Sequence, residues 1–142
     1  MLVVLAAATT FALIRAAIDG RFRGTHRVRG AADEQEEPMS VLDETALSAS
    51  LGERATLLQF SSAFCAPCRA TRRVLGDVAG AVPGVAHVEV DAEHHLELVR
   101  RVGVLRTPTT LVLDGDGVEI TRATGVPRKE QVLAALARAV GD

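Results

Sequence analysis

The strongest constraint on this chain is a pair of cysteines placed where an apolar strand passes into a helix. Residues 55–60, ATLLQF, form a short apolar run of strand length, and apolar side chains at helical spacing follow from Val74 to Val82. Between them lies SSAFCAPC, which holds Cys65 and Cys68, the only cysteines of the 142-residue sequence. The sequence therefore predicts that both sulfurs lie at one strand-to-helix junction.

The spacing of the two cysteines suits reversible disulfide chemistry. In a first helical turn, residues three apart bring their β-carbons to about 5 to 6 Å, so the pair can close and reopen. The unpaired N–H groups and the dipole of a helix beginning near Cys65 favour a thiolate there, and the thiolate is the attacking species. Pro67 fits that first turn without loss of a helix hydrogen bond, and Arg69 adds positive charge nearby. We expect Cys65 to be the nucleophile and Cys68 to resolve the mixed disulfide.

Two other uses of the pair are alternatives to disulfide exchange. A structural zinc site would need two more ligands, and the histidines show no paired spacing; they are His26, His87, His94 and His95. A binding module with a redox-inert pair is the second alternative, because a fold alone does not establish activity. Added stability is a poor explanation, since so small a loop constrains the unfolded chain little. Disulfide exchange, with no metal and no cofactor, is the preferred interpretation.

Composition excludes one class of partner. The chain is 48% hydrophobic and 24% charged, the balance of a folded globular domain. Its net charge of −2 attracts no nucleic acid, and 3% aromatic residues supply no platform for stacked bases. We therefore expect no nucleic-acid partner.

Strand and helix patterns alternate along the rest of the chain. A short helix is expected from Asp43 to Gly52, ahead of the apolar strand. Beyond the cysteines the patterns predict a strand, a helix, a hairpin of two strands and a last helix; these are residues 85–90, 93–102, 109–113 and 118–123, and a helix opened by Pro127. This order predicts an α/β fold with a central mixed β-sheet flanked by helices on both faces.

The chain begins with an uncharged apolar run, MLVVLAAATTFALI. A helix over residues 1–18 would be about 27 Å long, which reaches across a bilayer core if Arg15 snorkels to the interface. A cleaved signal peptide and a buried soluble helix are the alternatives. No lysine or arginine precedes the run and the positive charges follow it, which disfavours a signal peptide. We expect residues 1–18 to be a single transmembrane anchor.

Residues 19–40 are expected to separate this anchor from the folded domain at 41–142. Their first part is basic, with arginines at positions 21, 23, 27 and 29, and by the positive-inside rule this flank stays in the cytoplasm. Their second part, GAADEQEEPMS from 30 to 40, is acidic and typical of a solvated linker. The expected domain faces the cytoplasm, and an extracytoplasmic domain is the alternative.

From residue 41 to 142 the ordered motifs resemble the thioredoxin superfamily. The motifs are FCAPC after an apolar strand, Thr107-Pro108-Thr109 before the next strand, and Gly125 after the hairpin. The resemblance implies a thioredoxin-like fold, a cis peptide bond at Pro108, and thiol-disulfide oxidoreductase activity on proteins that contain disulfides. A dithiol electron donor or acceptor would be a second partner. The implied substrate-binding residues, across which a substrate strand would dock, are Phe64, Ala66, Pro67, Thr107, Pro108 and Gly125.

The chain departs from the thioredoxin pattern next to the cysteines. Gln59 stands six residues before Cys65, where a typical thioredoxin has a buried acid, and an amide does not accept a proton as a carboxylate does. Ser61 and Phe64 replace the usual tryptophans, Ala66 replaces a glycine, and the first strand is reduced to a vestige around 39–42. Deprotonation of Cys68 therefore needs water or another route. The chain is similar to the membrane-anchored thioredoxin-like proteins of bacteria.

Overall fold

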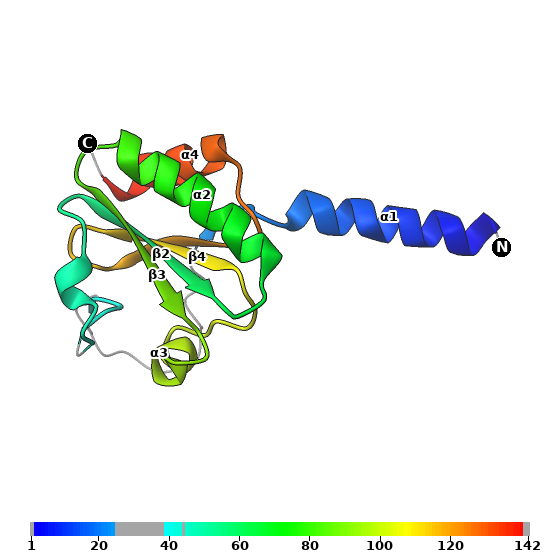
Figure 1. Cartoon of the computed structure of the whole chain (residues 1–142). Coiled ribbons are helices and arrows are strands. Elements are labelled where there is room, and N and C mark those ends of the chain that lie inside the picture. Colours follow the sequence, from blue (N-terminus) through cyan, green and yellow to red (C-terminus); the bar gives the residue numbers. More distant parts are fainter. Residues whose placement is uncertain (1, 25–38, 44, 141–142) are drawn as a thin grey trace, which may run out of the picture.

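A mixed sheet organises the computed structural model, which describes residues 2–24, 39–43 and 45–140. Over this part of the chain the sheet has five strands in the order β1-β5-β4-β2-β3 (Figure 1). The strands are β1 (Arg23–Gly24), β2 (Ala55–Ser61), β3 (Val85–Asp91), β4 (Thr109–Asp114) and β5 (Glu119–Thr124). β2 and β3 pair in parallel, whereas β4 is antiparallel to both β2 and β5. The mixed sheet predicted from the alternating patterns is confirmed.

Helices cover both faces of this sheet. α2 (Ala66–Ala81) and α4 (Lys129–Ala139) lie on one face, and α3 (Leu96–Arg101) lies on the other (Figure 1). Each face has its own apolar core. The core under α2 and α4 includes Leu57, Leu75, Val112 and Leu136, and the core under α3 includes Leu58, Phe60, Leu98 and Leu111. Because successive side chains of a strand point to opposite faces, β2 contributes Leu58 and Phe60 to one core and Ala55 and Leu57 to the other, and all of its residues are buried.

β1 lies in the segment that the sequence pattern assigns to the flank between anchor and domain. Its residue Arg23 lies opposite Arg122 of β5, so the strand adds to the edge of the sheet. Just before it, Gly20 is buried with φ +77°, and a β-carbon there would collide with the carbonyl group of Val126. Residues 19–24 are therefore packed on the domain. A two-residue strand is too short to leave a period in the sequence, which explains why the pattern did not reveal it.

The stretch before β2 contains less helix than the sequence pattern predicts. The helix expected to begin at Asp43 is reduced to the 3₁₀ turn η1 (Ser48–Ser50), and no side chain caps it. The Thr45 hydroxyl donates to the carbonyl oxygen of Leu42 at 2.6 Å and accepts from the N–H of Leu47 at 3.3 Å. Such local hydrogen bonds compete with regular helix, which accounts for the difference.

The expected remnant of a first strand at 39–42 is not a strand in the structure, where these residues form coil and a turn. Val41 donates its N–H to the carbonyl oxygen of Gly117 at 2.8 Å, so the chain is already on the domain at this point. Most of the predicted acidic linker at 30–40 lies outside the described residues.

α1 (Leu2–Ile18) projects away from the domain (Figure 1). It carries large apolar side chains that are exposed, including Val4, Phe11, Leu13 and Ile14. Among the described residues, no helix has both the length and the apolar character needed to cross a membrane. The helix expected over 1–18 is present, and its role as an anchor stays a prediction.

Candidate active site

Cys65 and Cys68 form a disulfide at the beginning of α2, with their α-carbons 5.2 Å apart. Cys65 is the N-cap of the helix, and its sulfur accepts a hydrogen bond from the N–H of Cys68 at 3.2 Å. The first N–H groups and the positive end of the helix dipole thus lie next to this sulfur and stabilise negative charge on it. Cys65 is half-buried, whereas Cys68 is only 2% exposed. Cys65 is therefore the sulfur that a protein partner reaches first.

The residues around Cys65 form an open rim. Phe64 has a left-handed backbone with φ 59° and its side chain is fully exposed. Ala66 and Pro67 occupy the first turn of α2 and are also exposed. Proline at this point costs the helix no hydrogen bond, as predicted from the sequence. The rim leaves room for an incoming chain beside the accessible sulfur.

Two loops from distant parts of the sequence meet at this rim. The peptide bond between Thr107 and Pro108 is cis, as the family resemblance implies. Hydroxyl oxygens of Thr107 and Ser62 lie 2.9 Å apart in a hydrogen bond, which joins the proline loop to the loop ahead of Cys65. Gly125, with φ +84°, donates its N–H to the carbonyl oxygen of Pro108 at 2.9 Å. The structure therefore brings together the cysteines and Thr107, Pro108 and Gly125, which are three of the six predicted docking residues.

Gln59 lies directly behind the cysteine pair and is completely buried. Its amide nitrogen donates to the carbonyl oxygen of Cys68 at 2.9 Å and to the hydroxyl of Ser61 at 2.8 Å. Since a carbonyl oxygen only accepts, this contact fixes the orientation of the amide. The amide oxygen consequently faces Nε2 of His87 at 3.0 Å, and that nitrogen must donate. Gln59 ties the backbone of Cys68 to β2 and has no proton-accepting role.

The hydrogen bonds continue from Ser61 to a charged pair. Ser61 donates to Glu89 Oε1 at 2.6 Å, and the Arg72 guanidinium holds both carboxylate oxygens at 2.5 and 2.8 Å. Partial burial pushes the pKa of Glu89 upward, but the hydrogen bonds from Arg72 and Ser61 outweigh it, so the pKa lies below its usual value. Burial lowers the pKa of His87, and its neighbour Glu89 opposes that effect only in part. The network thus favours a charged Glu89 and a neutral His87.

The sequence pattern alone does not place His87 and Glu89 at this site. His87 figured there only as a possible zinc ligand. A signal was present in the alternation of β3, where His87 and Glu89 lie on the same side of the strand. In the sheet Glu89 lies directly opposite Gln59 of β2, which brings that polar side against the buried amide.

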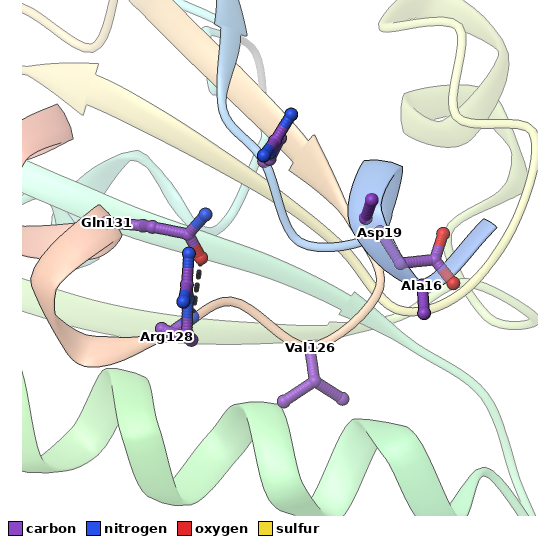
Figure 2. Close-up of a pocket in the computed structure, with 7 residues that line it drawn as sticks. Ala16, Asp19, Val126, Arg128 and Gln131 are labelled. Carbon is purple, nitrogen blue, oxygen red and sulfur yellow. Dashed lines mark hydrogen bonds between the residues drawn. The ribbon is translucent and has the colours of Figure 1, made fainter. Parts of the chain in front are cut away.

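A cavity of about 350 Å³ opens between the end of α1 and the loop that leads into α4 (Figure 2). Its lining residues are Ala16, Ala17, Asp19, Arg21, Val126, Arg128 and Gln131. Neither cysteine lines it, so it is separate from the redox pair. It borders the site through Val126, the neighbour of Gly125.

Three features together define a dithiol-disulfide exchange site. They are an accessible sulfur at a helix N-terminus, a buried sulfur one turn later, and a cis-proline loop beside both. The thioredoxin-like domain family matches residues 42–139, and the chain belongs to that family. It is a thiol-disulfide oxidoreductase of the thioredoxin type.

Relatives agree with this assignment, and a solved structure agrees with the fold. The thioredoxin of Chlamydia trachomatis is 25% identical over 100 residues, which cover 70% of this chain and 97% of the relative. The thiol:disulfide interchange protein DsbD of Ralstonia nicotianae is 28% identical over 121 residues, 80% of this chain but only 20% of that protein. A mutant thioredoxin from Halobacterium salinarum superposes with a TM-score of 0.63 at 19% identity, covering 79% of this chain and 98% of that one. At that identity the structural likeness shows the fold alone.

Proposed function

We propose that the Cys65–Cys68 pair reduces or exchanges disulfides in protein substrates. The observation that carries this proposal is the asymmetry of the two sulfurs. Cys65 is accessible and accepts an N–H hydrogen bond at the start of α2, whereas Cys68 lies buried behind it. Attack by the more accessible sulfur and resolution by the buried one follow from that arrangement.

The reaction proceeds in two exchanges. The Cys65 thiolate attacks one sulfur of the substrate disulfide, forms a mixed disulfide and releases the other substrate sulfur as a thiolate. Cys68, after losing its proton to water, attacks Cys65 and releases the second substrate thiolate. Two electrons pass from the cysteine pair to the substrate, the released thiolates take up protons, and Cys65–Cys68 is left as a disulfide. A dithiol donor restores the reduced pair by the reverse exchange.

The rim supplies a place for the substrate chain. Phe64 and the first turn of α2 flank the accessible sulfur, and the cis-proline loop lies next to them. In our proposal the substrate adds as an extended strand beside Thr107 and reaches towards Gly125. Backbone hydrogen bonds give such docking its affinity, so a wide range of sequences is accepted.

A trapping experiment tests the assignment of roles. With Cys68→Ser, the mixed disulfide on Cys65 is no longer resolved, and we expect covalent adducts with a disulfide-containing protein such as insulin on a non-reducing gel. The matched variant Cys65→Ser should form few, because the remaining sulfur is buried. Equal adducts from both variants would contradict the roles. Full retention of partner binding by the double serine variant, without any adducts from Cys68→Ser, would favour a redox-inert binding module instead.

We further propose that residues 1–18 attach the protein to a membrane. The support is the exposed apolar surface of α1 and the absence of acidic residues from this helix. Arg15, in the last turn of α1, lies over the ring of Phe11 at 5.9 Å, a position from which its charge can reach a lipid headgroup. Cell fractionation with alkaline extraction tests this proposal. Retention in the membrane fraction is expected for the full chain, and release into the supernatant would contradict it.

We place the domain in the cytoplasm and expect it to work as a reductant there. The arginines that follow the apolar run support this side, and cytoplasmic thiols are kept reduced. An impermeant thiol reagent applied to intact cells should leave Cys65 unmodified until the cells are lysed. Labelling in intact cells would instead show an extracytoplasmic domain that acts on exported proteins.

A further inference from the structure

The end of α1 is held against the domain by specific contacts. The Asp19 carboxylate pairs with the Arg106 guanidinium at 2.6 Å, and the same guanidinium nitrogen donates to the Thr124 hydroxyl at 2.7 Å. Gly20 donates its N–H to the carbonyl oxygen of Thr124 at 2.5 Å. A β-carbon on Gly125 would come within 3.1 Å of the Asp19 side chain, so these residues are tightly packed. The helix thus joins the domain without a flexible linker.

These contacts continue into the redox site. Arg106 directly precedes Thr107, whose hydroxyl is bonded to Ser62 at 2.9 Å, and Ser62 lies three residues before Cys65. The end of α1 therefore touches both loops proposed to bind substrate, the cis-proline loop and the Gly125 loop.

The direction of α1 follows from this junction. The helix leaves the domain at the end where β2 passes into α2, which is the end that carries the cysteines (Figure 1). If α1 enters a membrane, the rim around Cys65 is on the side of the domain that is turned towards it.

The surface around the junction suits an anionic membrane. Arg21 and Arg128 line the cavity next to the end of α1. Figure 2 shows Arg128 there, and Arg69 is exposed on the first turns of α2. Phe64 and Leu105 at the same end have apolar side chains that are almost fully exposed to solvent. Cationic and apolar side chains together favour the headgroup region of a membrane with acidic lipids.

We propose that the α1 junction holds the redox site against an anionic membrane surface, so that its substrates are disulfides of membrane proteins close to the bilayer. The proposal rests on the proposed exchange activity and membrane attachment. The electrons pass as described above, from the cysteine pair to the substrate disulfide, with a dithiol donor closing the cycle.

A paired-reporter experiment tests this inference on the full chain. The reduced protein is reconstituted in vesicles of phosphatidylcholine and phosphatidylglycerol with one of two single-spanning reporters. One reporter carries a disulfide immediately beside its span, and the other carries it beyond a long Gly/Ser linker. We expect single-turnover reduction of the near disulfide to be about ten-fold faster, because a fixed site has a high effective concentration there.

Two variants and a soluble substrate separate the possible results. Asp19→Asn with Arg106→Gln removes the ion pair of the junction, while the Gly20 hydrogen bond and the β1 pairing remain, and should lower the ratio of rates, whereas Glu97→Gln, which breaks a distant surface pair with Arg100, should leave the ratio unchanged. Equal rates for both reporters in the unaltered chain, with soluble insulin reduced normally, would overturn this inference alone. Failure to reduce any disulfide would overturn the proposed exchange activity, and failure to bind the vesicles would overturn the attachment.

Discussion

At the scale of single residues, the chain replaces a buried acid by a satisfied hydrogen-bond network. Gln59 is buried without charge, and each of its polar atoms has a partner. A buried amide of this kind stabilises the fold through its hydrogen bonds. A carboxylate in the same place would carry a large desolvation cost unless it took a proton. The backbone of Cys68 is therefore held in place by an uncharged donor.

Replacing Gln59 by leucine should test this role. Gln59→Leu keeps the size of the side chain but removes the amide hydrogen bonds to the carbonyl of Cys68, the hydroxyl of Ser61 and Nε2 of His87, while Ser61 keeps its hydrogen bond to Glu89. We expect the free energy of unfolding to fall by about 1 to 3 kcal/mol, as measured by urea denaturation. A change within about 0.5 kcal/mol, typical of an ordinary surface site, would show that the network adds little.

The network also predicts a pH dependence of stability. The pKa of His87 lies below its ordinary value of 6.5 in the folded protein, so the unfolded chain binds a proton more readily. The free energy of unfolding should therefore decrease as the pH falls through about 6.5, a range in which Glu89 stays charged. His87→Gln keeps a donor for Gln59 but does not titrate, so its stability should vary less between about pH 7.5 and 5.5. An identical slope in both proteins would rule out His87 as the source.

At the scale of elements, the edge of β5 is covered by the segment that follows α1. An uncovered edge strand presents unpaired backbone groups that recruit other chains, and β1 satisfies part of this edge. The close turn at Gly20 makes that cover possible, since its positive φ and lack of a side chain let the backbone approach Val126.

Two glycine substitutions, one in this turn and one at an ordinary helix position, should change the stability of the protein in opposite directions. Gly20→Ala forces a β-carbon into the Val126 carbonyl at a left-handed φ. We expect the free energy of unfolding to fall by about 1 to 3 kcal/mol. Gly80→Ala, within α2, meets no atom within 4 Å and should stabilise the protein by up to about 1 kcal/mol. Thermal unfolding of both variants checks the pair. An unfolding temperature of Gly20→Ala equal to that of the unaltered protein would contradict this role of the turn.

The elements also show what the sequence could reveal. The strand at 55–60 and the hairpin around Asp114 were predictable because burial and turn chemistry act on neighbouring residues. β1 and the 3₁₀ turn η1 were not predictable. β1 depends on pairing with residues far along the chain, and ahead of η1 the Thr45 side chain competes with regular helix. At the site, the cysteine spacing identified the chemistry. The partners of Gln59 emerged only from the pairing of β2 with β3.

At the scale of the whole molecule, a redox domain is joined directly to an apolar helix. The sheet and the two cores hold the cysteine pair rigidly at one end of the domain, and the α1 junction lies beside that end. The fold thus positions the two sulfurs for disulfide exchange, and the junction fixes the orientation of the domain relative to α1. Our central claim is that Cys65 and Cys68 form a reversible dithiol-disulfide couple that works as a reductant.

The most direct test of that claim is the reduction potential of the full chain in detergent micelles, equilibrated in glutathione buffers and read by alkylation after acid quench. We predict a single two-electron transition near the value of thioredoxin, about −270 mV, that is lost in Cys65→Ser. A transition at about −120 to −180 mV would contradict the reductive direction. The absence of any joint transition of the two thiols would contradict disulfide exchange itself.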